Sequence, residues 1–525
     1  MVRGARPSVT VRGIVVGLAA AIAGCPVFPD DRCVNGPCAG AVTAGDGGPA
    51  SAPSDDGDAG IAPDARVDAS ASARDDDPLL ALHVAPQGSD ATGTGTRESP
   101  FRTIARALAM ASGDEVSLHL CAARFDETVV HVESTRRLAI TGGYGCPGSS
   151  APWAVGAAGT GETRIVSSET HRFDVRALRL RSLRIEVTSA AATSGASSVA
   201  VDARTSAGTE VARAVLVAGD AAAGAPGDAN MGAAAVGLDG RAAIGTTGGT
   251  APELSCGANV FTRGGAGGSG SGTATRGGSG ATSSGSAGNA GSSGDDVTSR
   301  DCSAGGRGPD GHTAPLAGDA SDELDALSFV AAHGRQGNDG APGQGGGGGG
   351  TALARDGAPS GASGGCGGAG GAGGRGGGSS VALVVRGGDV ALTDTELRSG
   401  SGGAGGAGAR GANGAAGGRG VRLGETATAG PCSSGDGGFG AGGAGGEGGH
   451  GGASIGALVL AASRVVVNGD TITSSRDSAP SVTLGRAGTG GAAGLGGSGG
   501  AAFTPVAGRV GKDGLRQAIR IVTIR

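Results

Sequence analysis

Glycine occupies every third position from residue 402 to residue 420, in the stretch GGAGGAGARGANGAAGGRG. The same spacing recurs over 364–376, 437–452 and 488–500. A backbone with three residues per turn, like the polyproline-II helix, places every third residue along one edge. Glycine at that edge lets several such helices pack backbone against backbone, linked by amide and Cα–H hydrogen bonds. We therefore expect packed, extended rods in these segments.

Two alternatives compete with packed rods. A collagen triple helix needs proline as well as the glycine period, and none of the four glycine runs contains proline. The nearest match to collagen, GRQGNDGAPGQG at 334–345, provides only a few triplets. A flexible loop is the other alternative, because glycine loses more conformational freedom on ordering than any other residue. Rods form only if their packing compensates that loss.

The remaining composition points to a β-structure that does not bind nucleic acid. Aromatic residues make up 2% of the chain, with one Trp and one Tyr, and valine, leucine and isoleucine occur in short runs. The formal net charge of −6 gives no positive potential for attracting nucleic acid. Short aliphatic runs separated by glycine and polar residues are typical of β-strands.

The N-terminus has the features of an export signal. Arginines precede the apolar stretch GIVVGLAAAIAG (13–24), which is too short to span a membrane. The stretch ends in IAGC (22–25), which resembles the lipobox of bacterial lipoproteins. That resemblance implies a signal peptide over 1–24, cleavage before Cys25 and lipidation of Cys25. We expect a membrane-tethered protein of the cell envelope, in the outer membrane or at the cell surface; an ordinary signal peptide is the alternative.

Residues 25–78 are rich in Asp, Ala, Pro and Gly and contain almost no large apolar side chain. Such a composition cannot offset the entropy of ordering, so this segment is predicted to be an acidic, flexible linker. At residue 79 the composition changes to alternating apolar and polar residues. We therefore expect the folded domain to cover 79–525.

The start of that domain carries two short motifs. An aliphatic run is followed by PQGSD (86–90), a Gly/Thr-rich loop and SPFRTIARAL (99–108). These motifs resemble the opening of proteins of the pectin-lyase-like superfamily. The resemblance implies an all-β fold, a right-handed parallel β-helix solenoid closed by an N-terminal capping helix. Ser99 and Pro100 suit the first positions of such a helix.

The segment VRALRLRSLRIEV (175–187) alternates apolar and polar residues, and the alternation changes phase across Ser182. A change of phase is expected where a strand turns from one sheet to another. The side chains of Arg179, Arg181 and Arg184 would then point outward. They are candidates for contact with an acidic envelope or matrix polysaccharide; a solvated outer face is the alternative.

Three later segments share one pattern, a strand followed by a short break and a second strand. They are 197–219, 379–400 and 453–475. Glycine-rich sequence follows each of them. This self-similarity predicts solenoid coils with long insertions on one side. The predicted insertions cover about 220–378, 400–452 and 486–502.

Eight cysteines remain besides Cys25, and an even number in an exported protein suggests disulfides. They are Cys33, Cys38, Cys121, Cys146, Cys256, Cys302, Cys366 and Cys432. Proximity in the sequence favours the pairs Cys33–Cys38, Cys121–Cys146, Cys256–Cys302 and Cys366–Cys432. A zinc site is disfavoured because there is no C-x-x-C spacing and no cluster of histidines.

No signature of a polysaccharide lyase or glycosidase is visible, and fold alone does not imply activity. Gly361-Ala-Ser363-Gly-Gly365 fits the G-x-S-x-G template, and residues 305–313 partly fit a calcium-binding nonapeptide. Both matches are expected by chance in so glycine-rich a chain. The glycine blocks resemble those of glycine-rich (PGRS-like) surface proteins. We therefore expect a structural, adhesive or scaffold protein, not an enzyme, without metal or cofactor; carbohydrate binding or cleavage is the alternative.

Overall fold

The computed structural model describes residues 81–525 with short gaps, and residues Asp75–Arg525 form one compact unit. Cys25, Cys33 and Cys38 lie outside the described residues. The gaps are 128–130, 150–151, 156–160, 190–192, 230–231, 258, 271–274, 284, 287–301, 313–328, 352–355, 424–431, 463, 501–503 and 523–525.

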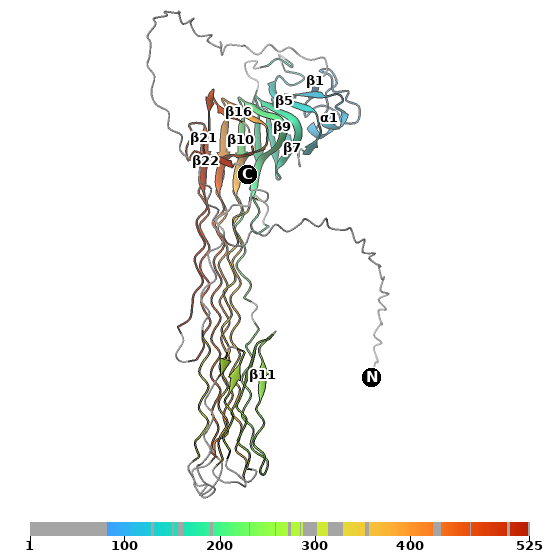
Figure 1. The fold of residues 1–525 in the computed structure, drawn as a ribbon. Helices are drawn as coiled ribbons and strands as arrows, with labels where there is room; N and C mark the ends of the chain where they lie inside the picture. Colours follow the sequence, from blue (N-terminus) through green and yellow to red (C-terminus); the bar gives the residue numbers. More distant parts are fainter. Residues whose placement is uncertain are drawn as a thin grey trace, which may run out of the picture. The chain divides into compact units, whose positions relative to one another are not determined.

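The described residues form one short α-helix and a series of β-strands, as expected for an all-β protein (Figure 1). The helix is α1 (Ile104–Met110). The strands are β1 (Ala81–Val84), β2 (Glu115–Cys121), β3 (Arg124–Asp126), β4 (His131–Glu133), β5 (Arg137–Tyr144), β6 (Arg164–Ser167), β7 (His171–Arg181), β8 (Arg184–Val187), β9 (Ser198–Ala212), β10 (Val215–Ala218), β11 (Glu253–Ser255), β12 (Phe261–Arg263), β13 (Ala281–Thr282), β14 (Gly285–Ser286), β15 (Ser380–Arg386), β16 (Asp389–Thr393), β17 (Glu396–Ser399), β18 (Ser454–Leu460), β19 (Val465–Val467), β20 (Asp470–Thr471), β21 (Val482–Leu484) and β22 (Arg516–Val522).

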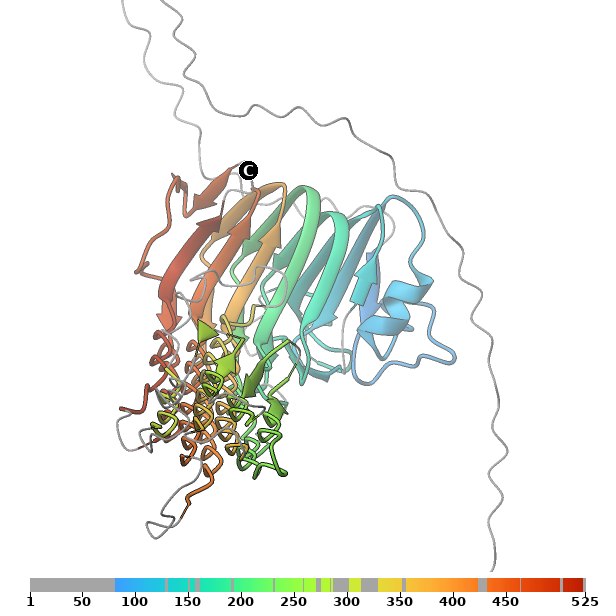
Figure 2. The same ribbon diagram turned by 60° about the horizontal axis from the view of Figure 1, so that its bottom comes forward.

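Most strands belong to two parallel sheets (Figure 2). The 12-stranded sheet has the central order β1-β2-β5-β7-β9-β15-β18-β22, and the 6-stranded sheet has the order β21-β17-β10-β8-β6-β3. Along the sequence the chain alternates between the two, for example from β6 to β7, β8, β9 and β10. Pairing is parallel throughout except between β19 and β20. A separate antiparallel sheet contains β11 to β14.

The change of phase at Ser182 is a turn between the sheets, as the sequence predicted. Ser182 has a positive φ of 50° and separates β7, in the larger sheet, from β8, in the smaller. Arg213 (φ 50°) and Asp394 (φ 47°) occupy the corresponding turns after β9 and β16. The amide of Ser182 donates to Ala212 O (3.1 Å), next to Arg213. Successive turns therefore repeat one conformation and are stacked on each other.

The core contains aliphatic side chains stacked in register from strand to strand. Ile140 pairs with Leu180, Leu180 with Val211, and Val211 with Leu392. All four are at most 4% exposed. Burying each such side chain stabilises the fold by roughly 1.5–3 kcal/mol. The predicted inward face of 175–187 is also found, since Leu178, Leu180, Leu183, Ile185 and Val187 are buried.

His171, at the start of β7, makes stability depend on pH. The side chain is 1% exposed, and burial lowers its pKa from 6.5 to about 4. As the pH falls through 6.5 the unfolded chain binds a proton that the folded chain does not, so stability is lost on acidification. Between pH 7.5 and pH 5 we expect a loss of about 2 kcal/mol from this residue. Urea unfolding of His171→Gln should lack that part of the pH dependence; equal pH dependence in both proteins would contradict it.

The expected N-terminal helix is present but begins later than the sequence suggested. Its N-cap is Thr103, not Ser99, and the Thr103 hydroxyl accepts from the Arg106 amide at 3.1 Å. The carboxylate of Asp90, the last residue of the PQGSD motif, accepts from the Arg102 and Thr103 amides (2.9 and 3.0 Å). Ser99 and Pro100 instead stay in the preceding loop, because Ser99 O accepts from the amides of Thr94 and Gly95.

The glycine-rich segments form a bundle of extended rods that leaves the two sheets at corresponding places (Figure 1). Three outgoing rods lead away from the sheets. They are 219–241 after β10, with a gap at 230–231, 400–423 after β17, and 485–500 after β21. Returning rods precede β15, β18 and β22, and they are 356–379, 432–453 and 504–515. Further rods lie between 244 and 350. The third insertion therefore continues beyond the expected 502.

Hydrogen bonds between rods advance in steps of three residues. In the rod 400–423, the amides of Gly405, Gly408 and Gly411 donate to the carbonyl oxygens of residues 489, 492 and 495 in the rod 485–500, at 2.8–2.9 Å. That rod also packs so closely against the returning rod 432–453 that a Cβ on Gly405 would collide with Gly449 O. The glycine period is therefore required by backbone packing. The described glycine segments are packed rods, which excludes flexible loops there.

Three disulfides join cysteines of the described residues. Cys121–Cys146 is the pair that proximity predicted, with Cα atoms 4.7 Å apart. The other two predicted pairs are wrong. The structure pairs Cys256 with Cys366 (Cα–Cα 5.4 Å) and Cys302 with Cys432 (5.9 Å), because the rod bundle brings residues from distant segments of the chain side by side.

Candidate functional site

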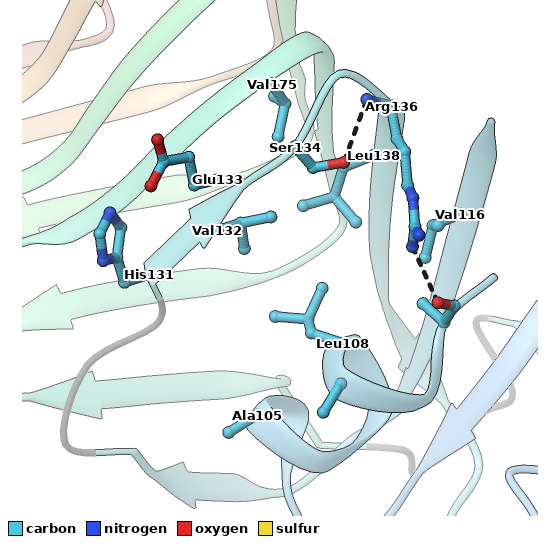
Figure 3. Close-up of a pocket in the computed structure, with 12 residues that line it drawn as sticks. Ala105, Leu108, Val116, His131, Val132, Glu133, Ser134, Arg136, Leu138 and Val175 are labelled. Atoms are coloured by element: carbon cyan, nitrogen blue, oxygen red, sulfur yellow. Dashed lines mark hydrogen bonds between the residues drawn. The ribbon is translucent and has the colours of Figure 1, made fainter. Parts of the chain in front are cut away.

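A cavity of about 410 Å³ opens between α1 and the edge of the larger sheet (Figure 3). Leu108 of α1, Val116 of β2 and Leu138 of β5 give it an apolar lining. Strand β4 contributes His131 and Glu133, which are both exposed and are separated in the sequence by one residue, Val132. The cavity therefore combines an apolar wall with two titratable side chains at its mouth.

Arg136 and Ser134, two of the polar residues that line this cavity, bond to neighbouring protein groups. Arg136 Nη1 donates to Ala111 O at 2.8 Å, which joins the segment before β5 to the end of α1 (Figure 3). The Arg136 amide donates to Ser134 Oγ at 3.1 Å, within the turn between β4 and β5. No hydrogen bond between His131 and Glu133 is present among the described contacts.

The arginines predicted to contact polysaccharide lie on two different sheets. Arg179 and Arg181 are on β7, and both pair with Glu210 of the neighbouring β9 (3.1 and 2.6 Å). Arg184 is on β8 in the smaller sheet and pairs with Glu186 at 3.2 Å. Carboxylates therefore offset much of their positive charge. This arrangement weakens the case for a surface that attracts an acidic polymer.

Glu186 is the centre of a small charge network on the smaller sheet. Arg164 Nη2 lies 2.5 Å from its carboxylate, in addition to the contact with Arg184. Partial burial acts to raise the pKa of Glu186, and the hydrogen bonds from Arg164 and Arg184 outweigh it, so the pKa lies below its usual value. The carboxylate remains ionised at neutral pH and holds both arginines on the sheet.

The chain has one Trp and one Tyr, and both are buried beside the Cys121–Cys146 disulfide. Trp153 is 7% exposed, its ring lies 4.6 Å from that of His83, and its Nε1 donates to Arg97 O at 2.9 Å. Tyr144 is 4% exposed and stacks on His119 at 4.4 Å. Neither ring is open for stacking on a sugar. The cluster instead fastens the 145–155 segment to the larger sheet.

The two weak motifs have structural roles. Ser363 is fully buried between rods, and its hydroxyl accepts from the Leu238 amide at 2.7 Å. Asp310, in the calcium-like segment, accepts from the Phe439 amide at 2.8 Å and pairs with Arg307. Within the described part of the chain no group of three or more His, Cys, Asp or Glu side chains is placed to hold a metal ion.

Comparison with known proteins adds no relative. No protein-family model, curated protein or solved structure matches the chain. Among the described residues, no helix has the length and apolar character needed to cross a membrane.

Proposed function

We propose that this protein is a lipid-anchored structural or adhesive component of the cell envelope. In this proposal a parallel β-helix of the pectin-lyase-like type carries a stiff bundle of glycine rods. Cys25 holds the chain on the membrane, and residues 25–78 act as the tether. The outer membrane or the cell surface is the proposed location.

Two features support the β-helix. The chain alternates between two parallel sheets over successive coils, and the turns at Ser182, Arg213 and Asp394 repeat one left-handed conformation. The aliphatic side chains stack in register between coils. Such stacking is what gives solenoids a continuous core without a large central cavity.

The observation that carries the structural role is the way the rods are held. Each pair of rods begins at the end of a strand in the smaller sheet and returns to the start of a strand in the larger one. Rods fixed at their base and bonded to neighbours every three residues resist bending. At about 3.1 Å per residue, a rod of about 20 residues reaches roughly 60 Å. That length suits a spacer or a contact surface.

The three disulfides indicate that the protein folds in an oxidising compartment and is exported. Lipidation can be tested by metabolic labelling with a palmitate analogue. We expect label on the wild-type protein and none on Cys25→Ser. Equal labelling of both proteins, or none on either, would contradict the proposed anchor.

The structural role is tested on a panel of acidic and neutral polysaccharides. We expect no saturable binding and no cleavage by the purified protein. The variant Arg179→Ser with Arg181→Ser provides the control. Saturable binding that this variant loses would contradict the structural role and support the alternative, a carbohydrate-binding protein.

A further inference from the structure

The outer face of the 6-stranded sheet carries two rows of side chains in register across β8, β10 and β17. The first row contains Arg184, Val215 and Glu396. The second row contains Glu186, Val217 and Arg398. Their neighbours along each strand, such as Ile185, Leu216 and Leu397, point into the core and are at most 1% exposed.

The order of charges on this face reverses across β10. On β8 the arginine precedes the glutamate along the strand, whereas on β17 the glutamate precedes the arginine. Each pair is joined within its own strand, Arg184 to Glu186 at 3.2 Å and Arg398 to Glu396 at 2.7 Å. The side chains of Arg398 and Glu396 are 44% and 37% exposed. The side chains of Arg184 and Glu186 are 20% and 21% exposed. The face is therefore zwitterionic, more open at β17 than at β8, with two half-buried valines at its centre.

We propose that this face binds a second copy of the chain through a two-fold axis that lies over β10, parallel to the strands. Such an axis places β8 of one copy opposite β17 of the other, and it leaves the position of each residue along the strand direction unchanged. Arg184 then lies opposite the partner's Glu396, and Glu186 opposite the partner's Arg398. The pairing occurs twice, as in any isologous interface.

The spacing and the apolar centre fit this arrangement. β8 and β17 both pair directly with β10, so they lie on opposite sides of the axis, each displaced sideways by one strand spacing of about 4.8 Å. Val215 and Val217 on β10 would meet their own copies and leave water. An apolar centre surrounded by complementary charges is the usual anatomy of a specific protein interface.

A two-fold axis perpendicular to the strands would also bring unlike charges together, by placing Arg184 opposite the partner's Glu186. The two axes differ in the direction of the rods, which leave the sheet at the ends of β10, β17 and β21. The axis parallel to the strands keeps both bundles pointing the same way, which favours it for two copies tethered to one membrane. This choice of axis rests on the proposed anchoring.

Charge exchange on one strand at a time tests the pairing. The first variant is Arg184→Glu with Glu186→Arg, and the second is Glu396→Arg with Arg398→Glu. Both keep an ion pair within the strand, and in the first the new carboxylate lies beside Arg164, its register neighbour on β6. Thermal unfolding that matches the wild type confirms that each variant folds.

The readout is capture between full-length copies that carry two different affinity tags, purified in detergent. We expect the wild type to capture itself and each variant to lose self-capture roughly 100-fold, because like charges then face each other twice. A mixture of the two variants should regain capture, since the first variant's β8 complements the second variant's β17.

Two results would overturn the inference. A wild type that remains monomeric up to high micromolar concentration would exclude the interface. Self-capture of either variant at the wild-type level would exclude the axis parallel to the strands. Neither result depends on palmitate labelling at Cys25, so failure of the anchor and failure of the interface are separate outcomes.

Discussion

Gly440→Ala is expected to lower the free energy of unfolding by about 3 kcal/mol, because it inserts a methyl group where backbone already fills the space. Gly440 is buried in the returning rod 432–453, and its amide donates to Ala415 O at 2.8 Å. A Cβ at this position would collide with Cys366 O of a second neighbouring rod. Urea unfolding followed by circular dichroism measures the change.

Gly232→Ala is the matched control. A Cβ on Gly232 would meet no atom within 4 Å, and the residue does not have a positive φ. The same substitution there should be neutral or stabilise by roughly 0.4–1 kcal/mol, because alanine reduces the entropy of the unfolded chain. Similar destabilisation at both sites would mean that the cost arises from losing glycine as such, and would contradict the packing account.

Removing the Cys302–Cys432 disulfide by serine substitution at both positions is expected to cost about 4–5 kcal/mol. The bond closes a loop across a sequence separation of 130, and loop-closure entropy grows with that length. The Cys121–Cys146 bond has a separation of only 25, so its removal should cost about 1.5 kcal/mol less. Denaturant unfolding of the two double variants compares these costs.

The connectivity itself is measured by mass spectrometry of a non-reduced digest. We expect linked peptides that contain Cys256 with Cys366 and Cys302 with Cys432. A peptide pair that links Cys256 with Cys302 would contradict the arrangement of the rods, since Cys256 and Cys302 bond to different rods of the bundle.

Much of the β-structure could be predicted because its signals are local. The phase change at Ser182 is visible in 13 residues of sequence and is found as a turn between two sheets. The packed rods could also be predicted from a local signal, because glycine at every third position marks the places where a neighbouring backbone leaves no room for a Cβ atom. The start of the helix was predicted wrongly. Ser99 and Pro100 suit the first positions of a helix, but the hydrogen bonds from the Thr94 and Gly95 amides to Ser99 O hold both residues in the preceding loop.

The partners of each rod and each charge could not be predicted from the sequence. All rods have the same three-residue period, so nothing local specifies that Cys256 lies beside Cys366. Arg179 and Arg181 were recognised as outward-facing, but their partner Glu210 lies about 30 residues away on the neighbouring strand β9. The cavity beside α1 was also missed, because it forms only where residues of α1, β2, β4 and β5, distant in the sequence, come together.

Amide hydrogen exchange, resolved by residue, is the most direct test of the rod bundle. In the rod 485–500 the amides of Gly491 and Gly494 donate to Gly449 O and Gly446 O at 2.8 Å. The amides of Ala492 and Leu495 have no acceptor among the described residues. We therefore predict slow exchange at Gly491 and Gly494 and fast exchange at Ala492 and Leu495. Uniformly fast exchange along this rod, or protection at every second residue, would contradict the account.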